Sequence, residues 1–390
     1  MSVCTSTDNR VLIVDALSGT NDFAVDLCQT LSGRCKLSVL TVENSRLNEA
    51  NFHGRLFKLW PYFGGGLGLA ALGKAARAFA RLIRELWRHR RGVVHSQFPR
   101  FYAMELAVFM LARPFLCRLV FTAHNAVPHE RSPWREALLH IWYRVPHRIV
   151  VLSQNVRREI VDRFGIPTEK IDVIPHGSYV AMRESCKEQA PSPLAVDILT
   201  RMQGKLLIFQ FGIIREYKGV DTLIAAARAL PVEQPWHILV MGGGSPELVE
   251  HYRTQILEAG LDSRITIQRT FLSNTDLAAL AERADILTFP YHNISQSGAL
   301  MLGLSFGKPC VCSDIPGFRE YLAEDEALFF GVRDSSQLAA ILTQLLCEPE
   351  LRERLGDAAW RAATGRYAWE SVADRYLESY GLTGRRPWPI

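Results

Sequence analysis

The sequence predicts an α/β protein made of two Rossmann-like domains that face each other across a cleft. Continuous apolar runs such as Arg10–Ala16 alternate with segments of helical periodicity. This alternation is typical of parallel strands that are buried on both faces of a sheet and joined by helices. It loosens once, in a polar, proline-containing stretch between Pro175 and Gly204, and then restarts. The 390 residues are enough for two domains of ordinary size.

The pattern divides the chain into four segments. Residues 1–178 form the first Rossmann-like domain, residues 179–203 the interdomain connection and residues 204–366 the second Rossmann-like domain. Residues 367–390 contain an amphipathic helix, which we expect to return to the first domain. In open parallel sheets, ligands bind at the carboxyl ends of the strands, so we look for functional residues directly after each strand.

Composition and charge limit the classes of function. Hydrophobic residues make up 48% of the chain and the net charge is +5, which suits a globular protein with an acidic small partner and does not indicate nucleic acid. No CxxC pair occurs among the eight cysteines, which favours a reducing compartment. The N-terminus lacks a signal-peptide pattern, and the apolar passage Met104–Phe121 is broken by Arg113 and Pro114. We therefore expect a cytoplasmic protein.

A candidate diphosphate site opens the second domain. A predicted strand ends at Gly212, Arg215 and Lys218 follow in the loop, and Gly219 precedes a helix. A helix N-terminus has free N–H groups and a partial positive charge. The two cationic side chains contribute further hydrogen-bond donors and further positive charge for a phosphate. The same spacing also fits an ordinary charged loop.

Two further loops of the second domain are candidate donor contacts. The glycine run Val240–Gly244 includes Gly243 and lets a ligand approach the backbone, although a run of this kind is more often a plain turn. It is not a GxGxxG motif. A nearly all-apolar helix then follows a buried strand, and its capped start can hold a phosphate or a sugar hydroxyl. The candidate residues at that start are Ser295, Gln296, Ser297 and Gly298.

The first domain has a polar loop after a predicted strand. It gathers His124, Asn125, His129 and Glu130 within seven residues, and a histidine or a carboxylate can take a proton from a hydroxyl. Asp22, after the first strand, is another candidate base, although it also fits a helix N-cap. The sequence has neither an HExxH nor a DxD motif, so we expect no bound metal.

A basic helix is predicted in the first domain. Five cations repeat every three or four residues, while apolar residues occupy other positions of the helical wheel. Such a helix can lie on an anionic membrane or contact a lipid diphosphate, and it can equally be an ordinary solvated helix. The five membrane-facing candidates are Lys74, Arg77, Arg81, Arg84 and Arg88.

These motifs together resemble those of the two-domain (GT-B) glycosyltransferases, in glycosyltransferase family 4 and its relatives. The resemblance extends over nearly the whole chain and is carried by "FGIIREYKGVDTLIAA", "VIPHGSY", "HILVMGGG" and "FPYHNISQSGALMLGLSFGKPCVCSDIPGFRE". The stretches "AHNAVPHERSPWRE" and "SQSGALMLGLSFGKP" are most similar to bacterial exopolysaccharide (GumI-like) mannosyltransferases.

The resemblance implies a metal-independent hexosyltransferase that uses a nucleotide-diphosphate sugar as co-substrate and has no cofactor. GDP-mannose is the first expectation for the donor and a UDP-sugar the second. Arg215 and Lys218 match the cations that hold the donor diphosphate, the stretch 295–298 matches the sugar and phosphate contacts, and Glu320 matches a ribose contact. The implied acceptor is a polysaccharide or a glycan on a polyprenyl diphosphate, with the protein peripheral on the inner membrane face.

The sequence departs from the family at one conspicuous point. The usual paired glutamates fall at Ile294 and Leu302, so the standard sugar and ribose contacts are in doubt, and the choice between inversion and retention stays open. Two alternatives follow. One is a nucleotide-sugar 2-epimerase on the same architecture, and the other is a non-catalytic relative that binds nucleotides.

Overall fold

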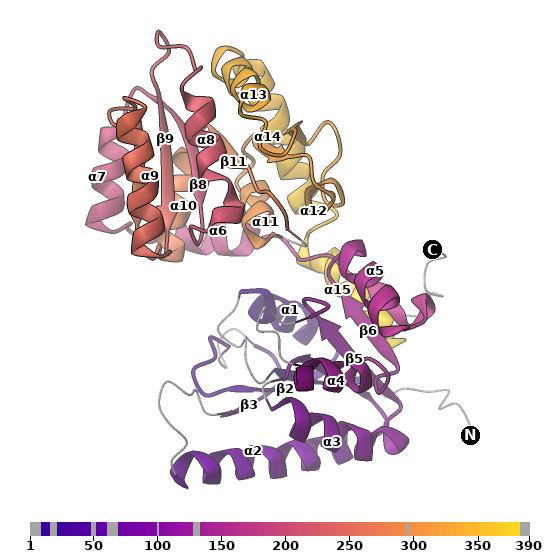
Figure 1. Ribbon diagram of the computed structural model, residues 1–390. Helices are drawn as coiled ribbons and strands as arrows, with labels where there is room; N and C mark the ends of the chain where they lie inside the picture. The colour runs from indigo at the N-terminus through magenta and orange to yellow at the C-terminus, as the bar shows by residue number, and fades with distance from the viewer. Residues whose placement is uncertain are drawn as a thin grey trace. The chain divides into compact units, whose positions relative to one another are not determined.

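The computed structural model describes residues 9–15, 22–47, 52–60, 69–99, 101–127, 133–294 and 297–382, and the statements below concern these residues (Figure 1). The chain forms two compact units. The first unit contains residues 1–177 together with 369–390, and the second contains residues 178–368. Each unit is an α/β domain built on its own parallel sheet, in agreement with the predicted fold class.

The first unit is built on a seven-stranded parallel sheet with the order β3-β2-β1-β4-β5-β6-β7. Strand order reverses between β1 and β4, and such a switch point is where doubly wound sheets bind their ligands. The strands are β1 (Arg10–Asp15), β2 (Lys36–Val42), β3 (Arg55–Trp60), β4 (Val93–Phe98), β5 (Arg118–Ala123), β6 (Arg148–Val151) and β7 (Ile171–Val173).

Helices cover both faces of this sheet (Figure 1). Leu12 and Val14 of β1 belong to the core that α2, α3, α4 and α5 complete, whereas Val11 and Ile13 belong to the core completed by α1 and α15. Burial on both faces explains why the strand is apolar without alternation. The helices are α1 (Asp22–Ser32), α2 (Leu69–Arg88), α3 (Tyr102–Ala112), α4 (Pro133–Trp142), α5 (Gln154–Phe164) and α15 (Trp369–Tyr380), with the 3-10 turns η1 (Arg113–Phe115) and η2 (Thr168–Lys170).

The second unit repeats this plan with a six-stranded parallel sheet in the order β10-β9-β8-β11-β12-β13. Its switch point lies between β8 and β11, which pair directly through Ile208 with Ile286 and Phe209 with Leu287. The strands are β8 (Leu206–Phe211), β9 (Trp236–Gly242), β10 (Ile265–Arg269), β11 (Ile286–Phe289), β12 (Cys310–Ser313) and β13 (Ala327–Phe330).

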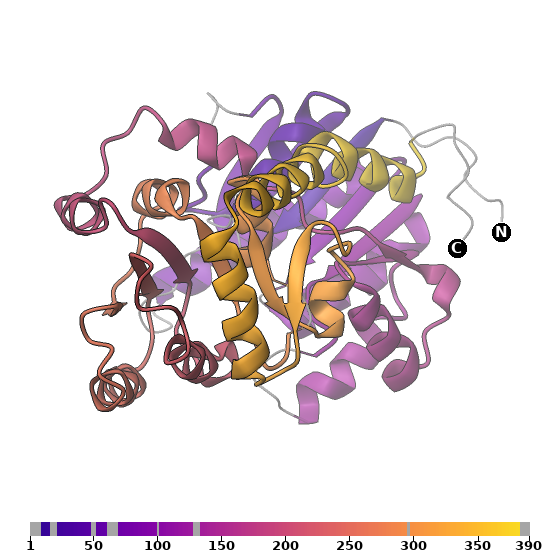
Figure 2. The ribbon, with the colours of Figure 1, turned by 90° about the horizontal axis from the view of Figure 1, so that it is seen from above.

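Helices also enclose the second sheet from both sides, which Figure 2 shows from another direction (dark red to orange). Leu207 and Phe209 pack in one core and Ile208 in the other, so alternate residues of β8 face opposite helical layers. The helices are α6 (Val180–Cys186), α7 (Pro193–Arg201), α8 (Val220–Ala227), α9 (Pro246–Glu258), α10 (Asn274–Arg283), α11 (Gly298–Ser305), α12 (Pro316–Arg319), α13 (Ser335–Cys347) and α14 (Pro349–Thr364), with the 3-10 turn η3 (Glu216–Lys218).

The segment expected to be a connection, residues 179–203, contains the helices α6 and α7 and belongs to the second unit. Met182, Cys186 and Ile198 pack into one of the two cores of that unit. Ser192 caps α7 by accepting a hydrogen bond from Ala195 N, and a proline at the first helical position follows it. Among the described residues, no helix combines the length and the apolar character needed to cross a membrane.

Candidate functional site

Two loops of the second unit leave the carboxyl ends of β8 and β11, on either side of its switch point. The first loop runs from Gly212 to Gly219 and includes η3, and the second leads from Phe289 to α11. Gly219 has φ = +66°, and a Cβ atom on it would clash with the carbonyl oxygen of Pro290. Only glycine fits this close approach, so the backbone itself brings the two loops together.

Lys218 is the central residue of this site. Its side chain is buried, with 9% of the residue exposed, and Nζ lies 5.0 Å from the centroid of the Tyr291 ring. A Cβ atom on Gly212, which has φ = +100°, would stand only 2.8 Å from Nζ. Gln210 of β8 holds the backbone of Lys218 in place, because its Nε2 donates a hydrogen bond to the Lys218 carbonyl oxygen at 2.8 Å.

The electrostatic state of Lys218 is unusual. Burial, together with the neighbouring Arg215 cation, lowers its pKa from 10.5 to about 8. Within the described part of the chain, no carboxylate lies within ion-pair distance of Nζ. A buried cation without a protein counter-charge is costly unless a ligand supplies the negative charge. The loop is therefore suited to an anion.

Tyr291 connects Lys218 with the start of α11. Its side chain is fully buried, and burial raises its pKa, with Tyr217 acting in the same direction and the neighbouring Ser297 opposing it. Ser297 is the N-cap of α11 and accepts a hydrogen bond from Leu300 N at 3.1 Å. The structure thus gathers Lys218, Tyr291 and a capped helix N-terminus on one edge of one sheet.

The remaining donor-site predictions have different surroundings. Arg215 is exposed as the N-cap residue of η3, near enough to Lys218 to influence it electrostatically. Gly298 begins α11, and a Cβ atom on it would lie 3.3 Å from the Tyr179 hydroxyl. Two predicted contacts at the entrance of α11, Ser295 and Gln296, lie outside the described residues.

The glycines after β9 pack against the loop after β8. Ile214 N donates a hydrogen bond to the Gly243 carbonyl oxygen at 2.6 Å, which ties the two loops together. A Cβ atom built on Gly243 has no atom within 4 Å, so its outer side is open to a ligand. Next to it, Thr270 N bonds to the Gly242 carbonyl oxygen at 3.1 Å, and the following Phe271 is 92% exposed. Sequence reasoning missed this aromatic side chain, which follows an ordinary strand without a motif.

Glu320 lies on the same side of the second sheet, at the C-cap of α12 after β12. Its carboxylate acts electrostatically on Tyr321 and Tyr367. The α12 turn is pressed against the loop after β11, because a Cβ atom on Gly317 would clash with the Ile294 carbonyl oxygen. Glu320 is half-buried and lies one strand further from the switch point than Lys218.

In the first unit, His124 follows β5 and meets the Phe23 ring edge-on, with ring centroids 5.1 Å apart. Burial lowers the pKa of His124 to about 3, and His176 and His95 contribute to the lowering. The imidazole is therefore neutral at physiological pH and can exchange hydrogen bonds with a hydroxyl. Asn125 is half-buried beside it.

The other acceptor-side candidates are only partly described. Asp22 is the first residue of α1, and its side chain is outside the described part of the structure. His129 and Glu130 lie outside the described residues altogether. None of the described residues forms a group of three or more histidine, cysteine or acidic side chains able to hold a metal ion.

Sequence reasoning did not single out two histidines near His124. His95 on β4 is buried, with Nδ1 2.6 Å from the Tyr380 hydroxyl and Nε2 2.7 Å from Thr122 Oγ1, and burial lowers its pKa to about 3. His176 follows β7 and lies 4.9 Å from the Phe23 ring, centroid to centroid. Only their positions in or just after predicted strands could have drawn attention to them.

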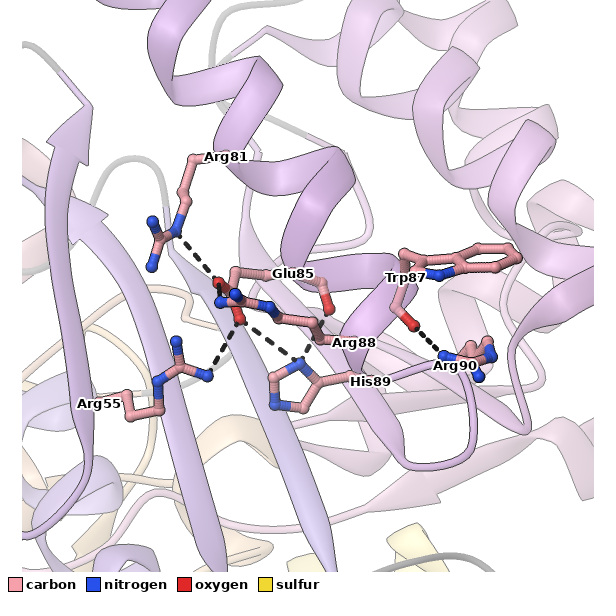
Figure 3. A network of polar contacts seen from close by, with 7 residues as sticks. All are labelled: Arg55, Arg81, Glu85, Trp87, Arg88, His89 and Arg90. Carbon is pink, nitrogen blue, oxygen red and sulfur yellow. Dashed lines mark hydrogen bonds and ion pairs between the residues drawn. The ribbon is translucent and has the colours of Figure 1, made fainter.

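The basic face expected on α2 is partly neutralised by the chain itself. Lys74 pairs with Glu43 at 3.0 Å, while Arg81 and Arg88 pair with the fully buried Glu85 at 3.1 and 2.8 Å (Figure 3). Arg55 and His89 also approach Glu85. Carboxylates of the same unit thus already hold three of the five α2 cations, and the membrane-facing role of the five stays a prediction.

Comparisons with known proteins agree with this architecture. The family model described as "Glycosyltransferase Family 4" matches residues 17–178, and the one described as "Glycosyl transferases group 1" matches residues 196–361. The boundary between the two matches falls close to the end of the first unit's long segment, at residue 177.

Two curated relatives have similar sequences. A D-inositol 3-phosphate glycosyltransferase of Corynebacterium efficiens is 27% identical over 335 residues, which cover 81% of this chain and 77% of the relative. A GDP-mannose:glycolipid 4-beta-D-mannosyltransferase of Xanthomonas campestris is 26% identical over 238 residues, covering 59% of this chain and 61% of the relative. The match thus spans less than two thirds of the Xanthomonas enzyme.

Solved structures share the fold at low sequence identity. HepE of Anabaena in complex with UDP has a TM-score of 0.72 and 17% identity, covering 96% of this chain and 100% of HepE. A glycosyltransferase from Rickettsia africae has a TM-score of 0.70 and 15% identity, covering 97% and 100%. These likenesses concern the fold alone.

Proposed function

Because this chain belongs to the GT-B glycosyltransferases, with a family 4 and a group 1 domain, we propose that it transfers a hexose from a nucleotide-diphosphate sugar to a hydroxyl of a glycan acceptor. GDP-mannose is the first choice of donor and a UDP-sugar the second. The name of the Xanthomonas relative supports the former. The proposed acceptor is a polysaccharide of the exopolysaccharide type or a glycan on a polyprenyl diphosphate.

The observation that carries this proposal is the buried Lys218 cation, which has no carboxylate partner among the described residues. Sugar transfer releases a nucleoside diphosphate, so negative charge grows on the phosphate oxygens as the glycosidic bond breaks. A fixed cation in a water-poor site stabilises that charge more than it stabilises the bound donor. Lys218 would thus lower the barrier without a metal ion.

Arg215 and the start of α11 complete the proposed diphosphate site. Arg215 is exposed and can reach a phosphate that Lys218 holds from the buried side. Ser297 satisfies the N–H of Leu300, which leaves the N–H groups of Gly298 and Ala299 for a ligand. Gly243 would let the nucleotide approach the backbone, and Glu320 would contact the ribose.

Leu302, one of the two positions where the family has glutamates, packs in the core of the second unit, and Ile294 packs against that core. Contacts to the donor sugar would therefore come from the entrance of α11. In the first unit, His124, Glu130 and Asp22 remain the candidates for the base, and Asn125 and His129 for acceptor binding. The low pKa of His124 favours a neutral hydrogen-bonding role toward the acceptor hydroxyl.

A thermal-shift panel with GDP, UDP, ADP and their common sugar conjugates tests the proposal. Ligand at about 100 times its Kd stabilises the folded state by about 2.7 kcal/mol, so the matching nucleotide should raise Tm by several degrees. The matched control is Lys218→Met, which keeps an unbranched side chain one atom shorter than lysine and removes the charge. If no nucleotide stabilises the wild-type protein, or if the methionine variant responds equally, the donor-site assignment is wrong.

A further inference from the structure

The outer face of α2, α3 and η1 in the first unit exposes an unusual amount of apolar surface. Four large side chains on this face are between 56% and 76% exposed: Ile83, Trp87, Leu111 and Phe115. Met104 and Met110 of α3 are also about half exposed. We call this the α2–α3 face. Contiguous apolar surface of this kind usually marks an interaction site.

The helix α3 shows why this face is not an ordinary solvated surface. Its single charged residue, Glu105, is fully buried, and Oε1 accepts a hydrogen bond from Phe101 N at 2.8 Å. The exposed positions of α3 are thus apolar, although a surface helix normally has a polar outer face. Glu85, the other acidic residue between positions 69 and 118, is also fully buried.

A hollow of about 260 Å³ lies between α2 and the α3–η1 segment. Trp87 and Phe115 both line this hollow, and their ring centroids lie 6.5 Å apart. Arg90 holds Trp87 in place, because Nη1 donates to the Trp87 carbonyl oxygen at 3.0 Å and the guanidinium lies 4.8 Å from the indole ring (Figure 3). The residues that line it include Ile83, Trp87, Arg90, Leu111 and Phe115.

Cations accompany the apolar surface, and no exposed acidic side chain of the segment opposes them. Arg84 lies next to Ile83 on α2 and Arg91 follows the helix; both are exposed. Among the described residues, neither Arg84 nor Arg91 has an ion-pair partner. Arg90 adds a third positive charge at the hollow. Aromatic and aliphatic side chains next to unpaired arginines are the chemistry of a membrane-surface helix.

We propose that the α2–α3 face docks the protein on an anionic lipid surface. Trp87 and Phe115 enter the boundary between headgroups and acyl chains, while Arg84, Arg90 and Arg91 stay at the level of the lipid phosphates. The contact is peripheral, since none of the described helices can span a bilayer. A second copy of the same face fits less well, because it would oppose one set of unpaired arginines with another.

This face differs from the basic stripe that the sequence indicated. Arg81 and Arg88 form ion pairs with Glu85. The cations that we propose to contact the lipid phosphates are therefore Arg84, Arg90 and Arg91. Ile83 belongs to the exposed apolar surface. The docking face also shares no residue with the donor site proposed above, and vesicle binding can be measured without any sugar transfer.

Flotation with vesicles of phosphatidylcholine and phosphatidylglycerol tests the inference. Two variants remove one half of the face each: Trp87→Ser with Phe115→Ser, and Arg84→Glu with Arg91→Glu. We expect the wild-type protein to float with the mixed vesicles and to bind pure phosphatidylcholine at least tenfold more weakly. Each variant should lower the partition coefficient for the mixed vesicles at least tenfold, and high salt should weaken the wild type.

Matched controls make the same changes in the second unit, at Val232→Ser with Leu257→Ser and at Arg228→Glu with Arg354→Glu, all exposed positions. These controls should float like the wild type, and thermal melts check that every variant is folded. Wild-type protein that stays unbound, or variants of the face that float as well as the controls, would overturn the inference. So would a dimer by light scattering that both variants of the face abolish, with no vesicle binding.

Discussion

The two units share a strand order but differ in the electrostatics of their buried polar groups. The second unit holds the Lys218 cation beside its switch point, without a carboxylate partner among the described residues. The first unit holds His95 within β4 and His124 directly after β5, and burial keeps both neutral by lowering their pKa values to about 3. One sheet thus presents a charge and the other presents uncharged hydrogen-bonding groups.

This difference indicates which ligand suits each unit. A buried cation favours an anionic ligand, in our proposal the donor diphosphate, whereas neutral imidazoles suit the hydroxyls of the proposed sugar acceptor. The folded pKa of Lys218 lies below its unfolded value, so the unfolded chain binds more protons between about pH 8 and 10.5. Stability therefore rises with pH through that window, and at neutral pH the charge costs on the order of 3 kcal/mol.

The largest expected effect comes from removing the charge in the second unit. Lys218→Ala should lower turnover about 10²–10³-fold, because one of the groups that stabilise the leaving diphosphate is lost. Lys218→Met should have the same effect on turnover while the melting temperature stays at or above that of the wild type, since the cost of the buried charge disappears. Steady-state kinetics and calorimetry measure both, and Lys187→Ala, at the exposed C-cap of α6, is the control. Near-normal turnover of the methionine variant would remove Lys218 from the mechanism.

A smaller effect is expected from pH. The affinity for a nucleoside diphosphate should fall about tenfold per unit above pH 8, because the free protein loses the Lys218 proton there. His95 and His124 do not titrate in this range, so the first unit should add nothing to the alkaline profile. Isothermal titration between pH 7 and 9.5 checks the slope, and Lys218→Met should give a flat profile. A wild-type profile without a break would contradict the assigned charge.

The smallest expected effect compares two helix caps. Ser297 caps α11 and Ser153 caps α5 in the first unit, each with a hydrogen bond to the N–H three residues later. Changing either serine to alanine should cost about 1 kcal/mol of unfolding free energy, as N-cap losses usually do. Only Ser297→Ala should also weaken nucleotide binding, by a few-fold. Urea denaturation and titration calorimetry separate the two effects, and equal binding by both variants would exclude α11 from the donor site.

Much of the fold was predictable because parallel strands buried on both faces read as continuous apolar runs. Both parallel sheets were expected from such runs, and the structure confirms the fold class. The strands β3 and β13 were not predicted, since "RLFKLW" mixes charges with apolar residues and "ALFF" is short. The helices α6 and α7 were missed because a polar stretch with prolines looks like a loop, although Pro193 is at a position where helices start.

The candidate site was predictable in its residue types and not in its contacts. The spacing of Arg215 and Lys218 indicated an anion site, but nothing in the sequence showed that Lys218 is buried against Tyr291. That contact depends on the clash-free approach of Gly219 to Pro290, which is a property of the folded backbone. The role predicted for the site residues stays a prediction until the variants above are measured.

Charge patterns along a helix were the least informative signal. Five cations on α2 suggested one basic face, yet Glu85 on the same helix is fully buried and gathers Arg81 and Arg88 around it (Figure 3). Counting charges along the sequence cannot show which of them a buried carboxylate neutralises. Two of the five cations, Arg77 and Arg84, remain exposed.

The route of the chain has a consequence for how the protein is made. The polypeptide leaves the first unit at Gly177, builds the whole second unit and re-enters the first at Trp369. Trp369, Tyr376 and Tyr380 of α15 fill one core of the first unit, beside Phe23. During synthesis, the first unit therefore cannot complete its core until α15 has been made. All residues of the second unit are synthesised before α15. The part synthesised first is the part completed last, and a truncation before residue 369 leaves its core open.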